Sequence, residues 1–364
     1  MSNSSNFQPN WASKPGDTIA DILSERKISV PTFADKMNSS TDYIHSLLAG
    51  YVGLTKDLCS KLEVVLGPSA DFWLRREIQY RESLARLKQI EENWIKELPI
   101  KEMVNWGWLK LDVNNKIDSC LQYFGVSSVN AWQTKYQTEI AMVNFRTSPA
   151  YKPQPAAVAA WLRQGEIQSE KINCNPWNAK LFKEKLVHIK KLTRIKNPGE
   201  FLPQLIDLCA DCGVAVVIAR TPSGCQASGV TKFIQPDRAL LMLSFRYLTD
   251  DHFWFTFFHE AGHLLLHGNK SVFVEEIGKD KVLSTQEIEA NDFAAEQLIP
   301  AELRIQLMRV AFTNKRSVVS FAALAGISPG IVIGQLQHIG KIEYSKMNSY
   351  KRRYSWDDIA PINH

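Results

Sequence analysis

The sequence predicts a multidomain protein, mainly α-helical, in which a bundle of short helices precedes a C-terminal α+β domain. The chain has 364 residues, which is too long for a single hydrophobic core. We therefore expect two or three domains of roughly 100–200 residues. Short capped helices fill the first 66 residues, whereas two apolar runs typical of strands lie beyond residue 210. Three prolines in SPAYKPQPAA (148–157) interrupt helices and indicate a domain boundary near residue 150.

The composition restricts the class of protein. Hydrophobic residues make up 45% of the chain and charged residues 22%, the balance of a globular protein in water. No apolar run approaches the ~20 residues of a membrane span, and the N-terminus lacks a signal peptide pattern, so we expect a cytoplasmic protein with no membrane partner. Cys209 and Cys212 have no second pair with which to form a zinc ribbon. The net charge of +5 neither requires nor excludes nucleic acid.

Four short helices are expected between residues 17 and 66. Asp17 is the predicted cap of the first, Ser39 or Ser40 of the third and Thr55 of the fourth, because these side chains accept from the first free backbone N–H groups. A longer amphipathic helix should follow from Ser69 to about Ile95. Its predicted apolar stripe consists of Phe72, Trp73, Ile78, Leu84 and Leu87. Pro99 ends this helix, and further short helices are expected over 100–147.

The C-terminal half combines strands with helices. GVAVVIA (213–219) and RALLMLSFR (238–246) are short apolar runs bounded by Gly, Pro or Asp, which is typical of buried strands. A helix at 251–267 follows them, which predicts an α+β domain. The basic stretch Lys351, Arg352 and Arg353 is expected to be a solvated tail.

The segment FWFTFFHEAGHLLLH predicts a metal site. His259 and His263 are four residues apart on a helix, so both imidazoles project from one face and can hold a single Zn²⁺ ion. Glu260 can reach a water on that ion and is the candidate general base for peptide hydrolysis. His267 is one further turn along, and three successive turns span ~12 Å, so we expect it to end the helix rather than bind the ion.

The third ligand is expected from STQEIEANDFAAEQLIP (284–300). Glu287 and Asn291 are four residues apart, so the carboxylate can bind zinc while the amide one turn later hydrogen-bonds a ligand histidine. Glu289 is the competing ligand, but the residue four positions after it is Phe293. We therefore favour Glu287.

These two motifs together resemble the ImmA/IrrE metallopeptidases. The matching residues are HEAGH at 259–263 and E-I-E-A-N-D-F-A-A from Glu287, with Pro300 beyond. The resemblance covers roughly residues 200–310 and implies a zinc endopeptidase with a zincin-like fold that cleaves a repressor or antitoxin-like protein. It also implies that the strand through Leu241 and Leu243 lies beside the cleft and pairs with an extended substrate, with the charged residues Arg246, Asp250 and Asp251 at the cleft entrance.

The region from Trp11 to about Leu87 is similar to HigA-type antitoxins of the helix-turn-helix class. The resemblance rests on Pro15-Gly16-Asp17, Phe33-Ala34, IHSLLAG at 44–50, Leu62-Glu63 and SADFWL at 69–74. It implies operator DNA, a homodimer and a cognate toxin as partners. The candidate DNA contacts are Ser40, Thr41, Asp42, Tyr43, His45 and Ser46. Residues 1–95 hold 11 Lys and Arg against 12 Asp and Glu, which disfavours tight phosphate binding, so protein docking or dimerisation is the alternative role of this region.

The expected domain order follows from these motifs. It consists of a HigA-like helix-turn-helix domain (1–97), a helical connector (98–150), an ImmA/IrrE-like zinc domain (151–310) and a helical extension with a basic tail (311–364). We expect a regulator whose zinc domain hydrolyses a repressor, an antitoxin or the chain itself, in a stress or mobile-element response. The alternative is a non-catalytic DNA-binding repressor that uses the zinc domain as a sensor or docking module.

Overall fold

The computed structural model describes residues 11–136, 154–268, 273–275, 285–309 and 315–359. The chain forms two compact units, Met1–Lys96 and Glu97–His364. Most of the proline-rich segment 148–157, and with it the expected boundary near residue 150, lies outside the described residues.

Unit 1 contains the four expected short helices around one core. Ser29, Ser40 and Thr55 each accept a backbone N–H at the start of a helix. The first helix starts two residues earlier than expected, at Pro15, so Asp17 is not its cap; its carboxylate instead accepts the Lys14 N–H at 3.0 Å. The helices are α1 (Pro15–Glu25), α2 (Val30–Met37), α3 (Thr41–Leu48) and α4 (Lys56–Leu66), followed by the long α5 (Ala70–Glu97).

The apolar stripe predicted for α5 is wrong at Phe72, Ile78 and Leu84, whereas Trp73 is buried and Leu87 is half-buried. Phe72, Ile78 and Leu84 are 39%, 49% and 37% exposed. The buried face instead follows the helical period through Trp73, Glu77 and Tyr80, which are spaced four and three residues apart. Glu77 is accommodated on this face because its carboxylate pairs with Arg81 at 2.7 Å.

Unit 2 is built on a mixed four-stranded sheet in the order β1-β3-β2-β4. The two predicted strands are β1 and β3, which are parallel; β2 is antiparallel to both β3 and β4. Because β3 has a partner on each side, it cannot pair with a substrate strand, and that prediction is wrong. The strands are β1 (Val214–Ile218), β2 (Gly229–Gln235), β3 (Arg238–Leu243) and β4 (Phe273–Glu275).

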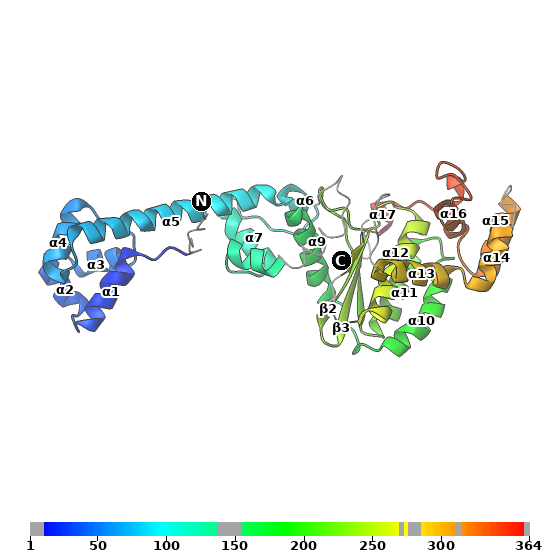
Figure 1. Ribbon diagram of the computed structural model, residues 1–364, viewed down its shortest axis with the longest axis horizontal. Coiled ribbons are helices and arrows are strands. Elements are labelled where there is room, and N and C mark those ends of the chain that lie inside the picture. The colour runs from blue at the N-terminus through cyan, green and yellow to red at the C-terminus, as the bar shows by residue number, and fades with distance from the viewer. Residues whose placement is uncertain (1–10, 137–153, 269–272, 276–284, 310–314, 360–364) are drawn as a thin grey trace, which may run out of the picture. The chain divides into compact units, whose positions relative to one another are not determined.

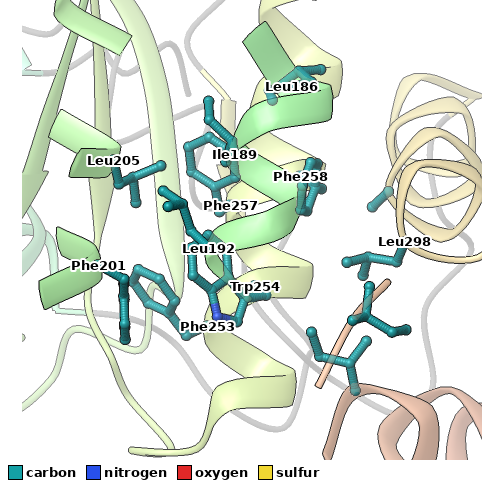
Figure 2. Close-up of a cluster of buried hydrophobic side chains, with 14 of the residues drawn as sticks. Leu186, Ile189, Leu192, Phe201, Leu205, Phe253, Trp254, Phe257, Phe258 and Leu298 are labelled. Atoms are coloured by element: carbon teal, nitrogen blue, oxygen red, sulfur yellow. The ribbon is translucent and has the colours of Figure 1, made fainter. Parts of the chain in front are cut away.

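Helices cover both faces of this sheet (Figure 1). Alternate residues along a strand point to opposite faces, so Val217, Leu240 and Met242 pack against α9 (Pro155–Ser169), whereas Val216 and Leu241 face the larger core. That core lies between the sheet and the helices α10 (Ala179–Leu192), α11 (Pro198–Ala210), α12 (Asp250–Leu266) and α13 (Thr285–Leu298). Figure 2 shows Trp254, Phe257 and Phe258 of α12 among side chains of α10 and α11.

The C-terminal segment is anchored on the start of α12. Oδ2 of the fully buried Asp250 accepts from the Ser328 hydroxyl at 2.7 Å, and Oδ1 accepts the Arg352 N–H at 2.9 Å. Asp251 pairs with Lys351 at 2.6 Å. These two aspartates therefore hold the chain end rather than a cleft entrance, and the basic stretch is not a solvated tail.

The remaining helices complete unit 2. Val318, Ile333 and Ile359 belong to the same core as the apolar residues of α12, so the C-terminal helices are part of unit 2. Among the described residues no single helix is long and apolar enough to cross a membrane. Taken together, the helices Arg316–Ala325 and Pro329–His338 have the length and composition of a membrane span, but the pair is bent. These helices are α6 (Ile100–Asn105), α7 (Lys116–Phe124), α14 (Ala301–Arg309), α15 (Lys315–Ala325), α16 (Pro329–His338), η2 (Asn348–Tyr350) and α17 (Trp356–Ile359).

Candidate metal centre

The expected histidines converge on one face of α12. His259 and His263 are each 1% exposed, because apolar residues surround them on this buried helix, and their Nε2 atoms lie 2.9 Å apart. One turn of helix separates their backbones, so both rings reach the same point in space. Two nitrogens this close can bind the same metal ion.

Glu287 of α13 completes the group. Its Oε2 lies 3.3 Å from His259 Nε2, and its Oε1 lies 3.6 Å from His263 Nε2. Close packing of the two helices brings it there: a Cβ on Gly262 would lie 3.3 Å from the Ala290 Cα, so glycine lets α12 approach α13. Within the described parts of the chain, His259, His263 and Glu287 form the single group of three or more His, Cys, Asp or Glu residues suited to a metal.

The group fits a zinc ion in geometry and in charge. Ligand atoms of a tetrahedral zinc site with bonds of ~2.0–2.1 Å lie about 3.4 Å apart, close to the separations of the three donors here. Burial lowers the pKa of His263 to about 4, so the imidazole is neutral at neutral pH. Burial opposes ionisation of Glu287, but hydrogen bonds with His259 and His263 outweigh it and lower the Glu287 pKa. Neutral imidazoles and an ionised carboxylate are the forms that bind a divalent cation.

The outer nitrogens of both histidines are hydrogen-bonded. His259 Nδ1 lies 3.0 Å from Asn291 Oδ1, and His263 Nδ1 lies 3.1 Å from His267 Nδ1. His267 Nε2 in turn lies 2.9 Å from Glu289 Oε2. The structure thus places Glu287 at the Nε2 atoms of His259 and His263, whereas Glu289, the competing candidate, contacts His267.

Glu260 lies against strand β2, which sequence reasoning did not identify. Its side chain is fully buried, and its carboxylate accepts from the Thr231 hydroxyl. A Cβ on Gly229 would lie 2.6 Å from Glu260 Oε1, so only glycine leaves space for this carboxylate. The local sequence carries no signal for this contact, because it depends on how the sheet packs against α12.

The candidate DNA contacts lie on α3 in unit 1. Ser40, Thr41, Asp42, Tyr43 and His45 are exposed, and Ser46 is half-buried. The opposite side of the helix packs into the unit 1 core through Ile44 and Leu47. Asn38, whose φ of 50° is left-handed, caps the C-terminus of α2, and α3 begins three residues later. This short turn between two packed helices is the geometry of a helix-turn-helix.

Unit 2 combines an α+β fold with a buried group of metal-binding side chains, and comparison with known proteins relates part of it to a peptidase family. Residues 214–334, from β1 into α16, match a peptidase family described as the IrrE N-terminal-like domain. The N-terminal region is a partial homologue of YddM of Escherichia coli, described as an uncharacterised HTH-type transcriptional regulator. The two are 38% identical over 61 residues, which is 17% of this chain and 65% of that regulator.

Proposed function

We propose that this protein is a transcription regulator in which a zinc-dependent endopeptidase domain hydrolyses peptide bonds of a repressor or antitoxin-like protein, or of the chain itself. The observation that carries the proposal is the convergence of His259, His263 and Glu287 beside the buried carboxylate of Glu260. The match to a peptidase family supports hydrolysis as the reaction.

His259, His263 and Glu287 are the residues that would hold the ion. Two imidazoles and a carboxylate form a donor set that suits zinc and leaves a fourth position for water or substrate. Zinc at this point would polarise a peptide carbonyl and lower the pKa of a water molecule.

Glu260 would act as the general base and then as the general acid. It follows His259 directly in α12, so its carboxylate belongs to the same turn as the first ligand. The carboxylate takes a proton from the attacking water and delivers it to the amine that leaves. Thr231 holds this carboxylate in place through its hydroxyl, and the buried surroundings strengthen its interaction with the proton it transfers.

A substrate strand would pair with β4 rather than with β3. β4 is the last strand in the order of the described sheet. Its residues 273 and 275 pair with Thr231 and Gly229, the two positions of β2 that contact Glu260. An extended peptide added along β4 would therefore run near the catalytic carboxylate, and its backbone would supply most of the affinity.

The exposed face of α3 favours a second candidate function. A non-catalytic repressor would bind the operator of its own gene through α3 and use the zinc domain as a sensor or docking surface. The regulator match in the N-terminal region supports this candidate. It predicts repression that is indifferent to the state of Glu260, whereas a regulatory peptidase must release fragments.

Co-expression with the products of neighbouring genes tests the proposal. Each pair would be purified, and the masses of its components would be measured by intact-mass spectrometry. The matched control is a His259→Ala variant, which lacks one of the three proposed metal ligands. We expect one neighbour, or the chain itself, to yield two fragments whose masses sum to the parent plus water, in the wild type alone. Identical fragments with His259→Ala would contradict metal-dependent hydrolysis.

A further inference from the structure

A chain of hydrogen bonds leads away from the metal group at His263. His263 Nδ1 lies 3.1 Å from His267 Nδ1, and His267 Nε2 lies 2.9 Å from Glu289 Oε2. The Nδ1 atom of His259 instead lies 3.0 Å from the amide oxygen of Asn291. The proposed reaction assigns no role to His267 or Glu289.

With an ionised Glu289 and a neutral His267, the acceptor at the end of this chain sets the direction of its hydrogen bonds. An ionised carboxylate only accepts, so His267 Nε2 carries the proton that it donates to Glu289. In a neutral imidazole the other nitrogen then has a lone pair, so His267 Nδ1 accepts, and the proton between the two rings belongs to His263 Nδ1. His263 Nε2 is consequently left with its lone pair toward His259 and Glu287, which is the form that binds a cation.

We propose that His267 and Glu289 are positioning residues that hold His263 in the orientation and tautomer that bind the metal. The inference rests on the proposed role of His263 as a zinc ligand. Partners of this kind fix a ligand ring and increase its basicity, and here the support extends through a second imidazole to a carboxylate.

The positions of His267 and Glu289 on their helices explain why they would support a metal ligand and would not bind the metal themselves. His267 follows the last residue of α12, one turn beyond His263, and its side chain is 6% exposed. Glu289 lies two residues after Glu287, about half a helical turn away, so it points past the ligand group to the end of α12. The two residues thereby join α12 to α13 at the C-terminal end of α12.

The exposure of Glu289 makes the inference testable without unfolding the protein. Its side chain is 52% exposed, so removal of its charge should change the folding free energy little. Zinc affinity would be measured by competition with a chromophoric chelator for wild type, Glu289→Gln, His267→Phe and the double variant. Glu302→Gln, an exposed change on α14, is the matched control.

We expect His267→Phe to weaken zinc binding by ~10–100-fold and Glu289→Gln to weaken it severalfold. Because Glu289 acts through His267, the double variant should bind zinc no more weakly than His267→Phe alone. The visible spectrum of the cobalt-substituted protein should change in both single variants and not in Glu302→Gln. Wild-type zinc affinity and spectrum in Glu289→Gln and His267→Phe would overturn this inference alone, whereas a wild type that binds no zinc would overturn the proposed function with it.

Discussion

Gly229 of β2 lies so close to Glu260 of α12 that a Cβ atom on the glycine would stand 2.6 Å from the carboxylate oxygen Oε1. The same Cβ would stand 2.7 Å from the Thr256 methyl group. Strand and helix therefore meet at the Glu260 carboxylate, with Thr231 two residues along the strand as its hydrogen-bond donor. The sheet thus restricts the position of the carboxylate that we propose as the general base.

Gly229→Ala is expected to impair hydrolysis more than it impairs folding. The added methyl group must displace the Glu260 carboxylate or the strand, a form of overpacking that costs about 1–3 kcal/mol. We expect at least a tenfold lower cleavage rate with zinc still bound, since the three ligands are untouched. Gly199→Ala, at an exposed glycine in the first turn of α11, serves as the control. Unchanged cleavage by Gly229→Ala would show that β2 does not position the base.

Glu287→Ala is expected to abolish stoichiometric zinc binding. The carboxylate lies within 3.3 and 3.6 Å of the two ligand nitrogens and supplies the negative charge of the donor group. Its loss should weaken zinc affinity by more than the ~10–100-fold typical of an outer partner. Metal analysis after dialysis measures this, and a zinc content equal to that of the wild type would exclude Glu287 as a ligand.

Asp250→Asn is expected to remove a pH dependence of stability. Burial and the neighbouring Asp251 raise the Asp250 pKa from 3.8 to about 6, although the Ser328 hydrogen bond opposes the shift. The folded chain then binds more protons than the unfolded chain in this window, so stability present below pH 3.8 is lost as the pH rises through about 6. The loss is on the order of 3 kcal/mol.

The asparagine variant can keep the hydrogen bonds of Asp250 to the Arg352 N–H and the Ser328 hydroxyl, so it isolates the charge. Its unfolding midpoint in urea, relative to that of the wild type, should increase from about pH 4 to about pH 6 and then stay constant. A difference that does not vary with pH would mean that Asp250 titrates normally in the folded protein.

Tyr43→Ala and His45→Ala are expected to weaken operator binding without affecting hydrolysis. Both side chains lie on the exposed side of α3, so their loss removes contacts to DNA and leaves the unit 1 core intact. Binding to the promoter region of its own gene, measured by fluorescence anisotropy, should fall roughly tenfold for each variant. Val64→Ser, at an 85% exposed position on α4, is the control. Equal affinity for all four proteins would favour protein docking as the role of α3.

The parts of the site that could be predicted from sequence depend on local geometry. The spacing of four residues between His259 and His263, and between Glu287 and Asn291, fixes which side chains share a helix face whatever surrounds them. The contact of Gly229 with Glu260 joins residues 31 positions apart through a strand that was not predicted. Nothing in the local pattern indicates such a contact, because it depends on how the sheet packs against α12.

The errors in the fold have the same physical origin. Asp250 looks like a charged residue at the surface start of a helix, yet it is buried by Ser328 and Arg352, which are 78 and 102 residues away. On α5, the helical period alone allowed several faces, and the position of the unit 1 core selected the one with Trp73. Tertiary packing decides both outcomes, and the local sequence does not encode it.

The most direct test of the account compares Glu260→Gln with the wild type in zinc content and in cleavage of the substrate found by co-expression. Glutamine has nearly the same shape but cannot accept the proton from water, and no ligand is changed. We predict equal zinc content and a cleavage rate lower by ~10²–10⁴-fold. A Glu260→Gln protein that holds zinc and cleaves as fast as the wild type would contradict the proposed mechanism.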